Sequence, residues 1–589
     1  MEQNDYWPVV ISEGAFVTGL IVADIVYRKW EKNRSVRAMS NTLLTLFDTD
    51  RYHEHYRSGL WRDDTIYALV RAHSEKAPER IALRSARGDL TYGTLINCVE
   101  AFASDLARKG VSVGQRVAVW LPSRAETVIA LLACSRNGYV CSPSLHRDHT
   151  VDDAVNLLKR MRATAVVAEE AYGADATKRD LFAQLSEVET LQHVYRLEKG
   201  VVGSEIGIVT VAPADVARQP LSNANRVVYL AFTSGTTGIP KGVMHSDNTL
   251  LANARALSFD WNITNESVVY SLSPLSHNLG FGAMIMTLAV GGQLVIHDLP
   301  RSRSLVDRLI ETGTTFLVGV PTHAIDLLAE VRFRNLSGVG RLRGFRISGA
   351  AAPQQVIAEL LKFGITPQSG YGMTETCSHQ YTLPNDDPKL IVESCGKSCS
   401  GYEIQIFDRE DPDRALQPYE IGQIGGRGAS LMLGYFDDQK ETEASFNRDG
   451  WFMTGDLGWI DENGYLRITG RKKDVIIRGG HNIYPAKIET LACTHHAIQR
   501  AAAVPVPDHR LGERVCLAVM FRSGTTASPD EILKHLYEVG LSKYDLPEFF
   551  VEVAEIPLTA SGKVRKRDVV DWIAEGRAKP VAIHWRPSA

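Results

Sequence analysis

Short apolar runs alternate with stretches of helical periodicity through the middle of the chain. The runs are four to six residues long and lie at 116–121, 164–168, 227–232, 293–297, 315–320 and 344–347. Runs of this length, bounded by turn residues, are typical of strands buried on both faces. Their alternation with helices predicts an α/β fold with parallel sheets covered by helices. Ligands of such folds bind at the carboxyl ends of strands, so the polar segments that follow the runs are candidates for chemistry.

The two ends of this region have other patterns. Residues 64–108 predict two helices around a short hairpin at 85–89, and the second helix ends at Gly110. The last part predicts a small α+β module, in which Ser528 and Glu531 form a capping box with Pro529 in the first helical turn. Its expected elements are strands at 475–477, 501–506 and 515–521 and helices at 485–493 and 528–539.

Residues 9–27 are apolar enough to suggest a membrane span, but they include Glu13 and Asp24. Each acid would cost about 2.5–3.5 kcal/mol at a bilayer centre. We therefore expect an appended helix and no transmembrane span, with peripheral membrane contact through the basic residues at 28–34 as a weaker alternative.

Composition sets broad limits. At 589 residues the chain exceeds the usual size of one hydrophobic core, so at least two domains are expected. A formal charge of -4 gives no reason to expect nucleic acid as a partner. Eight scattered cysteines favour reduced thiols and a cytoplasmic protein.

The run at 227–232 is followed by a segment built for phosphate. Seven of the ten residues at 233–242 are Gly, Ser or Thr, so the backbone can bend while amides, hydroxyls and one lysine face an anion. A Walker loop is excluded because Lys241 is followed by Gly242. The candidate phosphate contacts are Thr233, Ser234, Gly235, Thr236, Thr237, Gly238 and Lys241.

Two more polar segments stand out. In residues 368–376, Tyr371 lies between Gly370 and Gly372 and offers a ring for stacking, while Thr374 supplies a hydroxyl and Glu375 an oxygen ligand suited to Mg²⁺. In residues 451–458, Asp456 is well suited to accept hydrogen bonds from both hydroxyls of a ribose.

Together these motifs resemble the adenylate-forming superfamily of acyl-CoA synthetases, peptide-synthetase adenylation domains and luciferases. The resemblance covers roughly residues 60–570. It implies a large N-terminal domain of stacked α/β subdomains at 56–472 and a small mobile lid domain at 473–589. Residues 1–55 would be an extension of unknown role. Residues 425–428 and 434–435 match a turn-rich region of the family without obvious chemistry.

The resemblance also implies roles for single residues. Gly349, Ala350 and Ala351 would form a wall of the adenine site, Asp456 and Arg471 would hold the ribose, and the lid would turn about Lys473. The catalytic residues would be Lys563, Thr233, Glu375 and His277, and Gly479 and Gly480 would line the path of the CoA pantetheine arm.

The acyl pocket is expected to include His277, Asn278, Phe281, Val320 and Gly370. No acidic residue occurs from 272 to 297, which disfavours amino-acid substrates, because a buried ammonium without a counter-charge is expensive. These residues predict a medium-chain or alicyclic monocarboxylate with an uncharged tail.

The predicted function is therefore that of an ATP-dependent acyl-CoA synthetase that uses ATP, Mg²⁺ and CoA. Two alternatives are an enzyme that loads a carrier protein and a ligase for aryl or other carboxylates. A nucleotide sensor without turnover is disfavoured, because Lys563 and Glu375 are both present. Whether the protein forms a homodimer stays open.

Overall fold

The computed structural model describes residues 43–46, 48–199, 219–233, 240–298, 303–349, 353–558, 564–583 and 585. The elements below belong to one compact unit, Thr45–Ala589. Several predictions lie outside the described residues, namely the helix at 9–27 and the roles of Ser234, Gly235, Thr236, Thr237, Gly238, Ala350, Ala351 and Lys563. Among the described helices, none is long and apolar enough to cross a membrane.

The first sheet has the order β6-β5-β3-β4-β7-β8. Its strands are β3 (Arg116–Trp120), β4 (Val140–Ser142), β5 (Ala163–Glu169), β6 (His193–Leu197), β7 (Val227–Thr233) and β8 (Lys241–Ser246). Five strands run parallel as predicted, whereas β8 pairs antiparallel with β7. Since β8 begins at Lys241, the end of the predicted phosphate loop is strand rather than loop.

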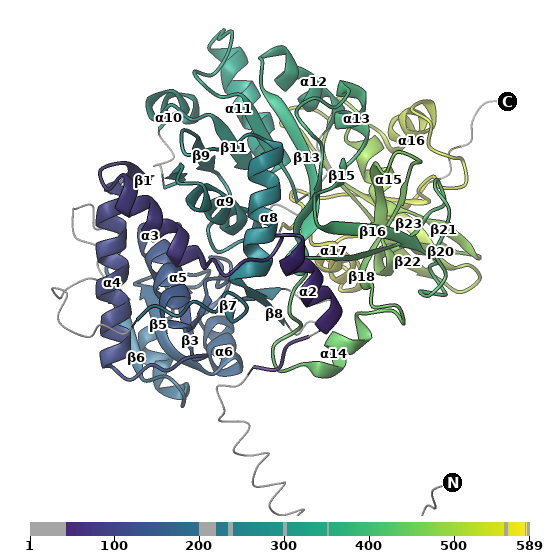
Figure 1. The fold of residues 1–589 in the computed structure, drawn as a ribbon. Coiled ribbons are helices and arrows are strands. Elements are labelled where there is room, and N and C mark those ends of the chain that lie inside the picture. Colours follow the sequence, from purple (N-terminus) through teal and green to yellow (C-terminus); the bar gives the residue numbers. More distant parts are fainter. Residues whose placement is uncertain are drawn as a thin grey trace, which may run out of the picture. The chain divides into compact units, whose positions relative to one another are not determined.

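Helices α3 (Ile66–Lys76), α4 (Tyr92–Arg108) and α5 (Ala125–Asn137) pack on one another beside this sheet, in the purple and blue part of Figure 1. The remaining helices of this part are α6 (Val151–Met161), α7 (Leu181–Gln184), the 3₁₀ turn η1 (Leu185–Glu187) and α8 (Asp247–Asp260). The predicted helices and the hairpin at 85–89 are confirmed, since β1 (Ile81–Ser85) and β2 (Gly88–Thr91) flank that turn.

The second sheet has the order β15-β14-β13-β12-β11-β9-β10-β1-β2. Its central strands are parallel, and β2, β14 and β15 add antiparallel edges. Its further strands are β9 (Val268–Ser271), β10 (Gln293–Ile296), β11 (Phe316–Gly319), β12 (Gly344–Ile347), β13 (Thr366–Met373), β14 (Cys377–Tyr381) and β15 (Lys397–Ser398). Strand β13 therefore includes Gly370 and Tyr371.

Helices cover both faces of this sheet. Helix α9 (Asn278–Ala289) contacts β9, β11 and β14, and α8 also contacts β14. The core on the opposite face joins strand residues to α10 (Leu305–Thr312), α11 (Pro321–Phe333), α12 (Gln354–Lys362) and α13 (Pro388–Glu393). In Figure 1, α8 runs between the first sheet and β13.

A third, antiparallel sheet contains β16 (Tyr402–Phe407), β17 (Gly422–Gly428), β18 (Phe452–Ile460) and β19 (Leu466–Arg471). The prediction of a turn-rich region at 425–428 is thus wrong, because these residues lie in β17. Aromatic rings explain the glycines: a Cβ at Gly425 would lie 2.6 Å from the Phe407 ring, and one at Gly426 would lie 2.5 Å from the Tyr402 hydroxyl. Helices α2 (Thr49–Arg57) and α14 (Gln439–Ala444) belong to the same region of Figure 1.

The fourth sheet follows the 3₁₀ turn η2 (Lys472–Asp474). It contains β20 (Ile476–Arg478), β21 (His481–Ile483), β22 (Ile498–Asp508), β23 (Gly512–Phe521), β24 (Phe549–Glu552) and β25 (Val581–Ala582). Its helices are α15 (Pro485–Ala492), α16 (Pro529–Glu538) and α17 (Lys566–Ala574), and the capping box at Ser528 is present as predicted. The sheet changes at η2, which contains the predicted boundary residue Lys473, and the boundary itself stays a prediction.

Asp247, at the start of α8, connects this helix to α3 and α5, which pack beside the first sheet. Its Oδ1 accepts hydrogen bonds of 2.8 Å from the Ile66 amide and the Ser135 hydroxyl. Burial outweighs these bonds and raises the pKa of Asp247 from 3.8 to about 6. The folded state therefore holds this proton more tightly than the unfolded state does, and ionisation as pH rises destabilises the fold.

Asp247→Asn is expected to remove this pH dependence, because an amide oxygen can accept both bonds without a charge. The pKa displacement corresponds to about 3 kcal/mol in total, of which about 2 kcal/mol falls between pH 4.5 and pH 7. In urea denaturation, the free energy of unfolding of the variant should rise by this amount relative to that of the wild type as pH rises. A constant difference between the two proteins would contradict the prediction.

Candidate active site

The ends of the predicted phosphate loop meet where β7 pairs with β8. Thr233 lies opposite Lys241, at the carboxyl end of β7. The Lys241 ammonium forms an ion pair with Glu441 and lies 5.0 Å from the centre of the Tyr435 ring. A phosphate that binds here would therefore replace the Glu441 carboxylate as the ion-pair partner of Lys241.

Strand β8 also connects the loop to the other sheets. Val243 forms an antiparallel bridge with Tyr435, and the Phe436 amide donates to the Gly242 carbonyl at 2.6 Å. His245 bonds to the Thr374 carbonyl at 2.7 Å through Nε2, and burial lowers the pKa of His245 to about 4. A neutral histidine and a backbone bridge thus hold residues 374 and 435 against β8.

Glu375 is buried beside this connection. Its Oε1 accepts a hydrogen bond of 3.0 Å from the Tyr435 hydroxyl. Burial raises the pKa of Glu375, and the charges of Lys241 and Arg471 oppose this effect. A divalent cation would compensate the buried carboxylate in the same way, so the residue fits its predicted role as a Mg²⁺ ligand.

The described residues contain no cluster of three or more side chains that could hold a metal ion. Magnesium is commonly bound through one or two carboxylates, with substrate phosphates and water completing the octahedron. A single buried glutamate beside a phosphate loop matches this mode, in which the ion arrives with its nucleotide.

Three predicted nucleotide contacts are brought together across the second and third sheets. The Tyr371 hydroxyl donates to Asp456 Oδ2 at 2.8 Å, and Arg471 Nε lies 3.0 Å from Asp456 Oδ1. Asp456 and Arg471 face each other across β18 and β19, and this pairing raises the pKa of Arg471. A carboxylate held from both sides has a fixed orientation, as a contact to vicinal hydroxyls requires.

Of the predicted adenine wall, only Gly349 lies within the described residues. Strands β12 and β13 run parallel, with Ile347 beside Ser369, and the Ser348 hydroxyl donates to the Gly370 carbonyl at 3.2 Å. Gly349 has φ of 93°, a conformation that a side chain would strain. Ser348, the first residue after β12, is thereby held beside Gly370.

The predicted acyl residues are only partly assembled. His277 caps α9 and accepts from the Leu279 amide at 3.4 Å, while Asn278 Nδ2 donates to the Met373 carbonyl at 3.3 Å. Phe281 is fully buried and stacks on Tyr229, with ring centroids 3.9 Å apart. Val320, at the start of α11, is also buried. Their role in substrate binding stays a prediction.

The hinge and CoA predictions fall on the fourth sheet and its entrance. Lys473 lies in η2, where partial burial lowers its pKa. Gly479 and Gly480 join β20 to β21 with φ of 57° and 86°, and both are exposed. Leu558 and Val564, which flank the segment containing Lys563, form an antiparallel bridge.

The sequence did not predict two residues that contact the site side chains, nor a histidine beside His277. Tyr435 and Glu441 contact the predicted site residues Glu375 and Lys241, although residues 434–435 had been noted only as a family match. His146 lies with its ring centre 6.1 Å from that of His277 and bonds to the Ser276 hydroxyl at 3.1 Å. Burial and the neighbouring His149 lower the pKa of His146 to about 4. Nothing in the sequence around His146 signals this position.

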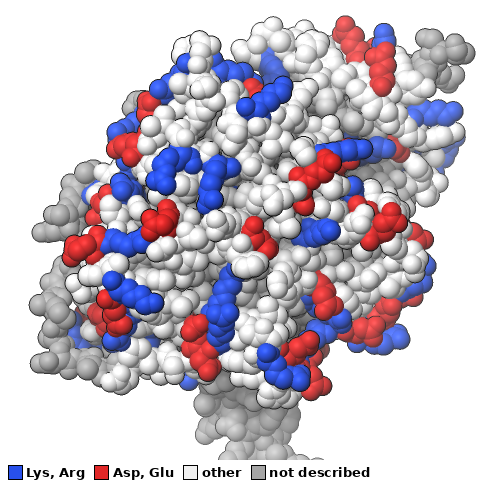
Figure 2. Space-filling model, turned by 45° about the horizontal axis from the view of Figure 1, so that its top comes forward, with Lys and Arg blue, Asp and Glu red and all other residues white. Residues whose placement is uncertain are grey.

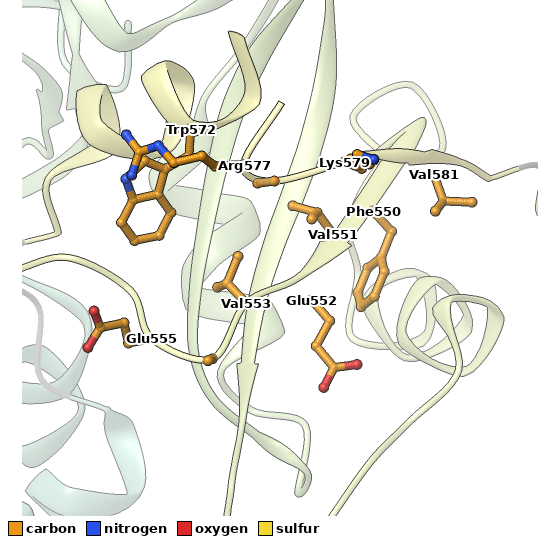
Figure 3. Close-up of a pocket in the computed structure, with 11 residues that line it drawn as sticks. Phe550, Val551, Glu552, Val553, Glu555, Trp572, Arg577, Lys579 and Val581 are labelled. Carbon is orange, nitrogen blue, oxygen red and sulfur yellow. The ribbon is translucent and has the colours of Figure 1, made fainter. Parts of the chain in front are cut away.

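A separate groove of about 650 Å³ lies between β24 and the segment after α17. Figure 3 shows apolar side chains of β24 beside charged ones such as Glu552, Arg577 and Lys579. None of the predicted site residues within the described part of the chain lines it. On the face of the molecule seen in Figure 2, acidic and basic side chains are interspersed.

The AMP-binding enzyme family matches residues 70–436, and its C-terminal domain matches residues 487–563. The chain belongs to this family. Among similar proteins, a medium-chain fatty-acid–CoA ligase of Escherichia coli is 29% identical over 90% of this chain and 94% of its own. A CoA ligase of Rhodococcus jostii for 3-(7a-methyl-1,5-dioxo-octahydroindenyl)propanoate is 30% identical over 85% and 97%.

Among solved structures, ATP-bound MatB from Rhodopseudomonas palustris is 27% identical, with a TM-score of 0.76 over 87% of this chain and 99% of that one. These findings confirm the predicted superfamily and the predicted α/β fold. They also confirm the predicted class of enzyme, an acid–thiol ligase of the AMP-forming type that uses ATP, Mg²⁺ and CoA.

Proposed function

We propose that this family member activates a medium-chain or alicyclic monocarboxylate with ATP and transfers the acyl group to CoA. The observation that carries the proposal is the assembly of Tyr371, Asp456 and Arg471 beside the buried Glu375. It supports a ribose contact and a cation ligand near the carboxyl end of β13. The relatives that act on medium-chain and fused-ring acids support the substrate class.

In the first step, a carboxylate oxygen attacks the α-phosphorus of ATP and pyrophosphate leaves. Two like charges about 4 Å apart repel by roughly 4 kcal/mol at an effective dielectric near 20, so neutralisation is the main task. Thr233, Lys241 and the rest of the loop at 233–242 would hold the phosphates, and Lys563 would bridge the carboxylate and the α-phosphate. When bound, Mg²⁺ would supply positive charge on the phosphate oxygens. The nucleophile is already ionised, so no general base is needed.

In the second step, the CoA thiol attacks the acyl carbon, and AMP and a proton leave. The mixed anhydride must be kept from water until the thiol arrives. We propose that the lid, residues 473–589, turns about Lys473, withdraws Lys563 and brings Gly479 and Gly480 over the acyl group. Glycines without side chains would leave room for the narrow pantetheine arm.

We place the enzyme in the cytoplasm, with residues 56–472 as the catalytic domain and residues 1–55 as an extension. A homodimer is compatible with this arrangement and is tested by the mass of the protein in solution.

The substrate class is tested by pyrophosphate release across a panel of carboxylic acids, with and without CoA. An apolar pocket stabilises each buried methylene by about 0.8 kcal/mol, which predicts kcat/KM rising several-fold per methylene from acetate to hexanoate and cyclohexanecarboxylate. Free amino acids and short dicarboxylates should be poor substrates. A preference for acetate or an amino acid would contradict the pocket assignment, and turnover only with an acyl-carrier protein would favour the loading alternative.

A further inference from the structure

Strand β12 carries an arginine into the interior of the second sheet. Phe345 and Ile347 point into the core of α10 to α13. The alternation of side chains along a strand puts Gly344 and Arg346 on the opposite face, and a Cβ at Gly344 would indeed meet the Phe316 ring of the other core at 2.6 Å. Arg346 therefore faces the side covered by α8 and α9, where the predicted acyl residues lie.

The polar atoms of Arg346 and its neighbour Gln368 are incompletely paired. Arg346 is 3% exposed and Gln368 is 0% exposed. Arg346 Nη1 donates to Gln368 Oε1, which fixes the amide orientation because the flipped amide would set two donors against each other. Among the described residues, Arg346 Nη2 and Gln368 Nε2 have no hydrogen-bond partner. Both free groups are donors, so the gap is complementary to an acceptor.

The positive charge of Arg346 also lacks a counter-ion. No carboxylate of the described residues forms an ion pair with it, and Asp260 accepts a hydrogen bond of 2.7 Å from the Tyr381 hydroxyl. The guanidinium lies 5.7 Å from the centre of the Tyr381 ring. Burial lowers the pKa of Arg346 to about 10, so it stays charged at neutral pH. A buried charge without compensation is costly, so its unpaired donor requires an explanation, such as a bound group or an internal water.

The free donors lie beside the predicted substrate position. A Cβ at Gly370 would be 3.2 Å from Arg346 Nη2, and Gln368 precedes Gly370 by two residues on β13. Asn278 of α9 reaches the same strand at Met373. The donor pair thus belongs to the sheet wall below Gly370, on the face toward α9.

We propose that Arg346 and Gln368 bind an oxygen acceptor on the acyl tail of the substrate, namely the carbonyl of an oxo-substituted monocarboxylate. This inference rests on the proposed function and refines it. The predicted acyl residues would line the apolar first part of the pocket, and the donor pair would select an acid whose far end bears an oxygen. Arg346 and Gln368 are specificity residues that act on the tail, away from the reacting carboxylate.

The test compares matched acids in three forms: unsubstituted, oxo-substituted at the far end and dicarboxylic. Cyclohexanecarboxylate, its 4-oxo derivative and cyclohexane-1,4-dicarboxylate form one series, and hexanoate, 5-oxohexanoate and adipate form another. A hydrogen bond to a charged group predicts a preference of about 10- to 100-fold in kcat/KM for an oxygen-bearing form. Arg346→Met should remove this preference while turnover of the unsubstituted acid persists, and Gln368→Leu should reduce it.

Arg116→Met is the matched control. Arg116 is also 3% exposed, and it donates to the carbonyls of Met161 and Arg162 at 2.7 and 2.9 Å on the first sheet. Its loss should lower stability without changing selectivity. Shifts of the melting temperature by each acid, measured without ATP, give a readout independent of turnover.

Different results would contradict the role of the donor pair and the proposed acyl-CoA synthetase activity. The donor pair would be refuted if the wild type showed no preference in kcat/KM for the oxygen-bearing acids, or if Arg346→Met kept the same preference. Internal water would then be the partner of the two unpaired donors. A carboxylate preferred over a carbonyl would keep the donor pair and overturn the monocarboxylate. Failure of every acid to react with ATP and CoA would overturn the proposed function itself.

Discussion

Replacing Lys563 with alanine is expected to slow adenylate formation by at least about 10²- to 10³-fold, the usual effect of removing one preorganised charge donor. Its ammonium would neutralise the approach of a carboxylate anion to the α-phosphate, and no other residue of the lid is assigned to this charge. The measurement is ATP–pyrophosphate exchange with a good acid substrate.

The same variant should still convert a synthetic acyl-adenylate to acyl-CoA, because Lys563 would be withdrawn before the thiol attacks. Lys566→Ala is the matched control, since this lysine lies in the same basic segment and its ammonium is held by Glu489 at 2.9 Å. It should keep both half-reactions. Equal loss of both half-reactions in Lys563→Ala would show that the lysine does not act in adenylation alone.

Gly480→Leu is expected to block thioester formation almost completely while ATP–pyrophosphate exchange continues. A leucine side chain would fill the path proposed for the pantetheine arm, and steric exclusion of a substrate has no partial compensation. Space on the protein side does not forbid the change, since no atom lies within 4 Å of the added Cβ. The two half-reactions are measured separately with the same acid.

Backbone strain must be separated from steric exclusion, since Gly480 has φ of 86°. Gly540 has φ of 94°, is exposed and also has nothing within 4 Å of an added Cβ, so Gly540→Leu carries similar strain away from the proposed path. It should keep CoA-dependent turnover. If Gly480→Leu also keeps near-normal turnover, the proposed path of CoA is wrong.

The sequence by itself determined the fold class and the chemical character of the site. Buried strands of the α/β part appear as unbroken apolar runs, and β3, β5, β7, β10, β11 and β12 lie where the runs predicted them. The motif around Glu375 and the capping box at Ser528 depend on local chemistry, which is readable within a few residues. Local spacing and hydrophobicity suffice for such features because their causes are themselves local.

Only the tertiary structure decided which groups share an environment. Tyr435 and Glu375 are 60 residues apart, and Tyr371 and Asp456 are 85 apart, yet each pair is hydrogen-bonded. The glycines at 425–428 suggested turns, but these residues lie in a strand. Glycine is required there because a side chain would collide with the rings of Tyr402 and Phe407. Arg346 sits in an otherwise apolar run, and its unpaired donor became visible only when β12 and β13 were aligned. Burial and pairing depend on residues brought together by folding, and no spacing along one chain records them.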